Sequence, residues 1–333
     1  MWKMILGFLI SFALSLLFTY VVIKLSKKIK SQQTILIYVE EHKSKQGTPT
    51  LGGIGFILAT IIVALCLNGF STYWVFGLAS GVGFGLLGFL DDFIKIRYKQ
   101  NLGLRPYQKI IGQVGISLIL AMYVYYFSGR GGQIVLPFSL KVVDIGFWVV
   151  PLVVVLCLAL TNAVNLTDGL DGLASNTSMQ YFLFMTIILV IFAGRQFNAG
   201  ELDSVVNGYN QLAIMQACLM GGVFAFLVFN TNKASIFMGD VGSLALGGFA
   251  SAVASLTGME LFVPIIGIIF VITTLSDIIQ VAYYKRTHKR VFLMAPIHHH
   301  FQKKGYSEAK IGFCYSAVTT IIGLISVLLI IIS

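Results

Sequence analysis

The sequence predicts an all-α polytopic membrane protein, and three observations carry that prediction. Of the 333 residues, 57% are hydrophobic and only 11% are charged, whereas ordinary globular domains carry about 25% charged residues. The mean hydropathy is +0.88, which leaves room for many apolar stretches of the roughly 20 residues that cross a bilayer. No polar stretch exceeds about 30 residues, so residues 1–333 are expected to form a single integral membrane domain.

Mean hydropathy over a window of about 19 residues predicts ten transmembrane helices. The first candidate is too long for a signal-peptide core and lacks a small-residue cleavage site, so we expect it to be retained. The ten candidates are 2–23, 49–69, 73–90, 110–127, 146–162, 178–194, 211–229, 243–257, 261–283 and 311–332.

Three segments carry further local signals. In 73–90, glycines at positions 77, 81, 85 and 88 allow a neighbouring helix backbone to approach closely. Between the fourth and fifth helices, 128–145 combines Gly131-Gly132 with an alternating run and predicts a small hairpin. The eighth helix, 243–257, is short and rich in glycine.

Lysines and arginines indicate the orientation. Loops after the odd-numbered helices would share one side of the membrane and hold 19 of the 23 basic residues. By the positive-inside rule that side is cytoplasmic, which places both termini outside the cytoplasm. The formal charge of +10 therefore lies on the cytoplasmic face. We interpret it as a topology signal and an electropositive surface, with no nucleic acid as partner.

Carboxylates at the expected cytoplasmic helix ends are candidates for function, because ionisable groups near a membrane core cost about 2.5 to 3.5 kcal/mol or more. Asp91 and Asp92 close the third helix and are followed by Lys95. Neighbours on a helix point about 100° apart, so we expect one carboxylate to face the site and the other a lysine. Two acids at a helix C-terminus oppose the helix dipole, which is unfavourable for stability alone.

A second cluster follows the fifth helix. Asn162 and Asn165 lie one helical turn apart, and Asp168 and Asp171 would repeat that spacing. Gly169 permits the close approach of a ligand. This density of amides, carboxylates and glycine at a membrane surface predicts a binding site more strongly than a capped turn.

The loop before the eighth helix holds Asp240 and Phe237. The Asp240 carboxylate could cap the next helix or bind Mg²⁺, which is usually held by one or two carboxylates plus substrate phosphates. Phe237 could stack on a nucleobase or anchor the chain at the membrane interface.

Histidines and lysines complete the cytoplasmic set. Three consecutive histidines, 298–300, lack the spacing of a helical zinc site. We expect one or two of them to hydrogen-bond a phosphate or a sugar. Lys45 precedes a Gly/Thr/Pro turn, which suits an anionic ligand, although attraction to lipid headgroups would also explain it. Together these clusters predict phosphate chemistry with a divalent cation.

Five motifs resemble the polyprenyl-phosphate N-acetylhexosamine-1-phosphate transferase superfamily over nearly the whole chain. The Ala-Pro-Ile-His-His-His stretch is similar to its phospho-N-acetylmuramoyl-pentapeptide transferase branch. The chain departs from the pattern at Lys233, where the family usually has Pro, and at 314–316, which replaces a common Arg-Phe-Trp run. The motifs are 45–53, 88–95, 162–174, 237–243 and 295–301.

This resemblance implies transfer of phospho-MurNAc-pentapeptide from UDP-MurNAc-pentapeptide to undecaprenyl phosphate, with Mg²⁺, giving lipid I and UMP. It implies that Asp240 ligates Mg²⁺ and that Asp91 handles the lipid phosphate with Asp92 in support. Asp168 matches a third essential aspartate, as nucleophile or ligand. Substrate-binding positions implied by the resemblance or by the clusters above are Lys45, Thr50, Asn162, Asn165, Gly169, Leu170, Asp171, Asn230, Phe237, Gln280, His298, His299 and His300.

Several alternatives stay open from the sequence. Lys95 could neutralise charge during direct attack of the lipid phosphate, or the reaction could pass through a phospho-aspartate. A sibling transferase would use UDP-GlcNAc or UDP-GalNAc, and a different class would be a transporter of acidic solutes. The resemblance also implies a homodimer in the bilayer of a bacterial plasma membrane, with a cytoplasmic active site.

Overall fold

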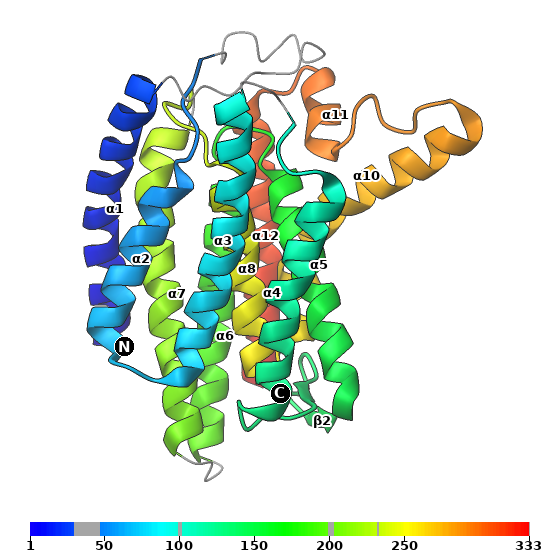
Figure 1. Cartoon of the computed structure of the whole chain (residues 1–333). Coiled ribbons are helices and arrows are strands. Elements are labelled where there is room, and N and C mark those ends of the chain that lie inside the picture. The colour runs from blue at the N-terminus through cyan, green and yellow to red at the C-terminus, as the bar shows by residue number, and fades with distance from the viewer. Residues whose placement is uncertain (30–46, 99–101, 199–202, 232, 333) are drawn as a thin grey trace.

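The computed structural model describes the chain except for residues 30–46, 99–101, 199–202, 232 and 333. It is a bundle of helices with one small two-stranded sheet (Figure 1). The long helices are α1 (Trp2–Ile29), α2 (Gly53–Asn68), α3 (Thr72–Tyr98), α4 (Pro106–Tyr126), α5 (Val149–Thr167), α6 (Leu173–Asn198), α7 (Asp203–Asn230), α8 (Gly239–Thr257), α10 (Ile268–Thr287) and α12 (Glu308–Ile332). Short helices are η2 (Gly146–Trp148), η3 (Glu260–Phe262), α9 (Val263–Ile266) and α11 (Ile297–Lys303).

The all-α polytopic prediction is confirmed. Within the described residues, nine helices are long and apolar enough to cross a membrane, and α2 is a shorter apolar helix of 16 residues. Nine of the ten expected segments overlap one long helix each, and the remaining one, 261–283, is divided. The count of ten spanning helices stays a prediction, because α2 is shorter than a typical span.

The ninth expected helix is interrupted in the structure. The prediction of one helix over 261–283 is wrong at Gly267, which ends α9 and begins α10. The Gly267 N–H bonds the Val263 carbonyl at 2.8 Å, and a Cβ at this position would lie 2.7 Å from the same oxygen. After the break, α10 projects sideways from the bundle (Figure 1). We call α10 and the loop that follows it, residues 268–296, the arm. Hydropathy averaged over a window does not detect such a break.

Helix α8 is the central element of the bundle. All of its residues from Val241 to Thr257 are buried, and it packs against α3 and α5. Small residues of α3 allow this close packing. Gly81 of α3 lies against Phe249 of α8, and Gly88 lies against the Asp240 backbone with no space for a Cβ. The close approach expected from the α3 glycines is confirmed. It brings the end of α3 to the beginning of α8.

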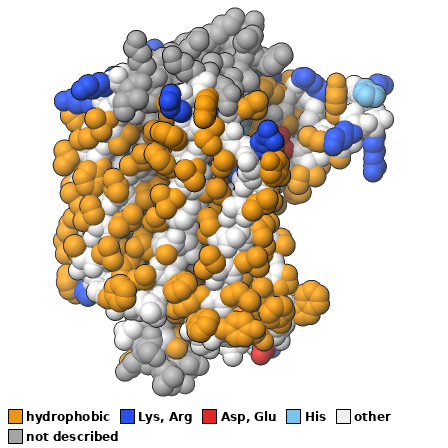
Figure 2. All heavy atoms as spheres, in the orientation of Figure 1, with side chains coloured by type: hydrophobic (Ala, Val, Ile, Leu, Met, Phe, Trp, Pro, Cys, Tyr) orange, Lys and Arg blue, Asp and Glu red, His pale blue; other side chains and the backbone are white. Residues whose placement is uncertain are grey.

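The two ends of the bundle differ in what they carry. Hydrophobic side chains cover the visible face, and Lys and Arg gather at the upper end and on the projecting arm (Figure 2). Both chain termini lie toward the lower end (Figure 1). The hairpin expected in 128–145 is confirmed: β1 (Gln133–Val135) pairs antiparallel with β2 (Val142–Asp144). It docks under α8 through a 2.7 Å bond from the Val135 N–H to the Gly258 carbonyl.

Candidate active site

Three carboxylates from two helices meet at the upper end of the bundle. Asp91 and Asp92 lie in the last turns of α3, and Asp240 lies in the first turn of α8. One oxygen of each lies within 4.8 Å of the others. Asp91 and Asp92 are buried and Asp240 is partly exposed. The sequence separates Asp92 from Asp240 by more than 140 residues, and the close packing of α3 on α8 brings them together.

Two lysines neutralise part of this charge. The Lys95 Nζ lies 2.6 Å from Asp91 Oδ2 and 3.2 Å from Asp240 Oδ2. It also lies 3.5 Å from Asp92 Oδ1, so both acids of α3 face the same lysine and the expected division between them is wrong. The Lys109 Nζ, from α4, lies 2.8 Å from Asp240 Oδ2. Three carboxylates against two ammonium groups leave one negative charge, which favours a further cation.

Asp240 is held from a second side by an amide. The Asn165 Nδ2 donates to Asp240 Oδ1 at 2.9 Å and to Ser243 Oγ at 2.8 Å. Met238 occupies the cap position of α8, so the alternative in which Asp240 caps this helix is wrong. Its two carboxylate oxygens therefore point to the lysines and to Asn165, into the site.

Backbone groups fix the two acids of α3. The Val241 N–H donates to Asp92 Oδ2 at 3.1 Å, and the Leu104 N–H donates to Asp91 Oδ1 at 2.8 Å. A Cβ at Gly103 would lie 2.5 Å from Asp91 Oδ1, so a larger residue there would displace the carboxylate. These contacts hold the carboxylates in place while one face of the cluster stays partly exposed.

The residues present fit a divalent cation. Carboxylate oxygens are the ligands that Mg²⁺ prefers, and Asp91, Asp92 and Asp240 bring three carboxylate groups to one point. The lysine nitrogens contact the same oxygens that a cation would use. A cation would therefore compete with, or displace, the lysines.

A tight turn, residues 168–172, lies beside the acid cluster. Helix α5 ends at Thr167, and Asp168 is its C-cap residue, so Asp168 and Asp171 do not continue the helical spacing expected for them. Burial raises the pKa of the Asp168 carboxyl well above its usual range, and the nearby charges of Asp240 and Asp92 raise it further. Asp168 therefore lies near the three carboxylates, and its role in the site stays a prediction.

Asn230 holds this turn against the loop that precedes α8. Its Oδ1 accepts from the Gly172 N–H at 3.1 Å, and its Nδ2 donates to the Ile236 carbonyl at 3.0 Å. Asp171 contributes a second link, because its Oδ2 accepts from the Ala234 N–H at 3.0 Å. Leu170 is buried in a small apolar cluster with α12. The side chains of Asn230 and Leu170 are thus engaged in holding the turn.

The histidines lie on α11, next to the turn. His298 is buried, and Gly169 lies so close to its Nε2 that no Cβ would fit. His299 is partly exposed and its Nδ1 lies 3.0 Å from Gln302 Oε1. His300 faces the projecting arm, where its Nδ1 accepts from the Leu293 N–H at 3.1 Å. His298 and His299 therefore lie against the turn 168–172, and His300 holds the loop that follows α10.

Gln280 lies apart from the acid cluster, on α10. Its Oε1 accepts from the backbone N–H groups of Val291 and Phe292 at 3.1 and 2.9 Å, which ties the end of the arm back to the helix. A role for Gln280 in binding a substrate stays a prediction.

The loop before α8 runs alongside the segment before α2. The Phe237 N–H donates to the Pro49 carbonyl at 2.8 Å, and the Phe237 carbonyl accepts from the Gly52 N–H at 2.9 Å. Thr50 is buried there. Lys233 has a φ of +71°, which a proline cannot adopt, so the loop departs from the family pattern where the sequence does. Lys45 lies outside the described residues.

Sequence reasoning missed Lys109 and Gln113. Because α4 begins at Pro106, four residues before the expected start, Lys109 lies on the helix that faces the site, and Gln113 lies further along the same helix, inside the expected span. Gln113 is fully buried, and its side-chain amide forms hydrogen bonds of 3.0 and 3.5 Å with that of Asn162. Asn162 thus contacts α4, one turn away from the Asn165 that contacts Asp240. A polar glutamine inside a predicted membrane span was the sequence signal that could have indicated this contact.

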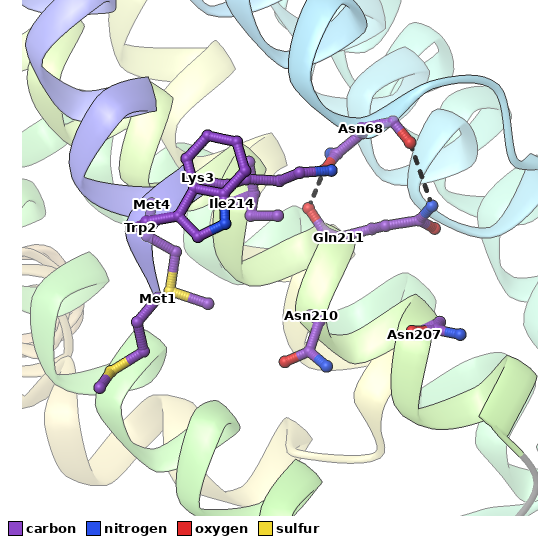
Figure 3. Close-up of a pocket in the computed structure, with 9 residues that line it drawn as sticks. All are labelled: Met1, Trp2, Lys3, Met4, Asn68, Asn207, Asn210, Gln211 and Ile214. Atoms are coloured by element: carbon purple, nitrogen blue, oxygen red, sulfur yellow. Dashed lines mark hydrogen bonds between the residues drawn. The ribbon is translucent and has the colours of Figure 1, made fainter.

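A pocket of about 400 Å³ lies at the opposite end of the bundle (Figure 3). Four amide side chains, Lys3 and the apolar start of α1 line it. Asn68 and Gln211 bond each other's backbone carbonyls at 2.9 and 3.3 Å across it. Its lining includes none of the residues predicted for the site, and no carboxylate. The acid cluster therefore stands as the candidate active site.

Comparisons with known proteins find similar transferases over nearly the whole chain. Residues 74–258 match the family model described as glycosyl transferase family 4. The phospho-N-acetylmuramoyl-pentapeptide-transferase of Clostridioides difficile (strain 630) is 40% identical over 321 residues, covering 96% of this chain and 95% of the relative. The protein of that name from Clostridium perfringens (strain 13 / Type A) is 42% identical over 321 residues, covering 96% of each chain. The one from Clostridium kluyveri (strain NBRC 12016) is 41% identical over 330 residues, covering 98% and 99%.

Proposed function

The chain belongs to the phospho-N-acetylmuramoyl-pentapeptide-transferase family and is a membrane transferase, and on that premise we propose its reaction. It transfers phospho-MurNAc-pentapeptide from UDP-MurNAc-pentapeptide to undecaprenyl phosphate, forming lipid I and releasing UMP. The observation that carries the proposal is the cluster of Asp91, Asp92 and Asp240 with Lys95 and Lys109, beside the turn 168–172. Acids that hold a cation, and lysines that neutralise phosphoryl oxygens, suit a diphosphate donor and a lipid phosphate acceptor.

The chain's own residues bring two anionic substrates together. Lys95 and Lys109 supply two positive charges at the point where the phosphates would meet, and with a cation bound to the carboxylates they would offset the repulsion between the phosphates. Asp91 orients the lipid phosphate with Asp92 in support, and the turn 168–172 with Phe237 receives the nucleoside. Mg²⁺ held by Asp240, with Asp91 and Asp92 beside it, would neutralise phosphoryl oxygens when bound.

Direct attack is the simplest reaction for this arrangement. An oxygen of the lipid phosphate forms a bond to the phosphorus that carries the sugar, the bond from that phosphorus to UMP breaks, and UMP leaves with the bond's electron pair. In a two-step route the Asp168 carboxylate would attack first. Positional isotope exchange and trapping with the nucleotide substrate alone distinguish the routes. A chemically competent phospho-Asp168 would overturn direct attack.

The membrane arrangement is part of the proposal. The acid cluster and most lysines and arginines belong to the same end of the bundle, so we assign that end to the cytoplasm of a bacterial plasma membrane and both termini to the other side. The chain is proposed to act as a homodimer. A cytoplasmic site meets both a soluble nucleotide and a lipid at the membrane face.

The test is UMP release by the purified full chain in detergent or vesicles with undecaprenyl phosphate and Mg²⁺. UDP-MurNAc-pentapeptide should support release, and UDP-GlcNAc and UDP-GalNAc should not. Release with either of those two donors, and none with the first, would assign the chain to a sibling transferase. Uptake of the nucleotide into sealed vesicles without any UMP release would assign it to the transporter class.

A further inference from the structure

A carboxylate outside the acid cluster connects the turn 168–172 to α11, the helix that carries the three histidines. Glu308 lies in the first turn of α12, and it alone among residues 303–310 is shielded from solvent in part. Its Oε2 accepts from the Asp171 N–H at 3.2 Å. Its Oε1 accepts from Gln302 Nε2 at 3.4 Å. One side chain thus holds the turn 168–172 and α11 together.

The chain of bonds continues to a histidine. An ionised carboxylate only accepts hydrogen bonds, so Glu308 requires Gln302 to present its amide nitrogen. Gln302 Oε1 is then directed to His299 Nδ1, 3.0 Å away, and accepts a hydrogen bond from its N–H. In the neutral imidazole the proton therefore sits on Nδ1, and Nε2 is the nitrogen that can accept a hydrogen bond. That Nε2 is near Gly169: a Cβ at Gly169 would lie 3.2 Å from it.

We infer that Glu308 is a positioning residue that locks α11 onto the turn 168–172 and, through Gln302, sets which nitrogen of His299 carries the proton. The inference rests on the proposed function for its kinetic readout. His299 then presents an accepting rather than a donating nitrogen toward the turn that is proposed to receive the nucleoside.

The variant Glu308→Gln tests the donor and acceptor logic. The new amide has one carbonyl oxygen, which stays with the Asp171 N–H, so its nitrogen would face the Gln302 amide nitrogen. Gln302 then has to rotate, and it presents its nitrogen to His299 Nδ1. We expect the His299 proton to move to Nε2 and the KM for UDP-MurNAc-pentapeptide to rise about two- to tenfold, the effect of losing one hydrogen bond between neutral groups.

The double variant Glu308→Gln with Gln302→Glu restores the pattern. The carboxylate introduced at position 302 accepts from His299 and from the amide introduced at position 308, and that amide still accepts from the Asp171 N–H. The proton should return to Nδ1, and KM should return close to the wild-type value. Lys310→Gln, a change of one unit of charge on the same turn of α12, is the matched control and should keep the wild-type KM.

Nitrogen-15 NMR of the labelled imidazoles in the full chain reads the tautomer directly, with His299→Gln to assign its signals. An unchanged His299 tautomer and KM in Glu308→Gln would overturn the inference. A double variant no better than either single one would overturn the relay. If wild-type protein released no UMP, the proposed function would fail, and the NMR measurement would still decide the inference.

Discussion

The two ends of helix α8 meet two clusters of charge that are built in opposite ways. At the first turn, three carboxylates share two lysines and stay partly open to solvent. Just beyond the last turn, Glu260 meets Arg130 one to one at 2.7 Å, and both side chains are buried. The Arg130 guanidinium also donates to the backbone carbonyls of Ser255 and Gln133.

The difference separates a functional cluster from a structural one. A matched and enclosed pair leaves no charge for a ligand, and it joins the hairpin side of the molecule to the end of α8. An unmatched cluster with an exposed side leaves a negative charge that a cation can satisfy. Burial and ionisable groups occur at both ends, so neither property alone identifies the site. The local balance of charge does.

The largest expected effect is on stability, at the enclosed pair. Glu260→Ala leaves the Arg130 guanidinium buried without its partner, and breaking such a pair costs about 3–5 kcal/mol. Thermal unfolding of the full chain in detergent should show the loss, and the double variant Arg130→Met with Glu260→Leu should recover most of it. If Glu260→Ala unfolds like wild type, or if its folded fraction turns over abnormally, the structural assignment of this pair fails.

The next effect is on turnover, at the open cluster. Asp240→Asn keeps the shape of the side chain but removes its charge, so the variant should assemble normally and lose about 10²–10³-fold in UMP release. Thermal unfolding of the same preparation is the control for folding. Turnover and Mg²⁺ dependence like those of wild type would remove Asp240 from the mechanism.

A smaller effect is expected for Lys109→Met. Losing a hydrogen bond between two charged groups costs about 1.5–3 kcal/mol, so turnover should fall about tenfold or more. The cluster also becomes more negative by one charge, so the Mg²⁺ concentration for half-maximal activity should decrease. Titration of UMP release against Mg²⁺ measures both quantities. Lys141→Met, at the hairpin end, is the matched control, and a Mg²⁺ requirement that rises in Lys109→Met would contradict the prediction.

The smallest effect is a change in pH dependence. Because the folded-state pKa of Asp168 is raised, the folded chain binds more protons here than the unfolded chain does. This group's contribution to stability is full below its unfolded pKa, and it is lost as pH rises through the folded pKa. In EDTA, Asp168→Asn should therefore gain stability relative to wild type as pH rises, measured as the difference in Tm. Parallel Tm curves from acid to alkaline pH would contradict it, and Asp144→Asn is the control.

Some elements of the site could be predicted from the sequence because their signals are local. Asp91, Asp92, Asp168 and Asp240 are carboxylates at the ends of apolar runs, where such groups are costly, and each was predicted as a site residue. Lys109 was missed because its partner, Asp240, lies 131 positions further along the chain. A basic residue in a basic loop gives no sign of such a contact.

The sequence by itself determined the membrane class and the approximate helices, because hydropathy is a sum over neighbours in the chain. It also placed the carboxylates at one set of helix ends. Tertiary structure alone decided the break at Gly267, the pairing of Glu308 with the turn 168–172, and the charge balance at each end of α8. These depend on which helices pack together and how closely. The α3 glycines permit close packing, but only the fold shows that α8 fills the space and carries Asp240 to Asp91 and Asp92.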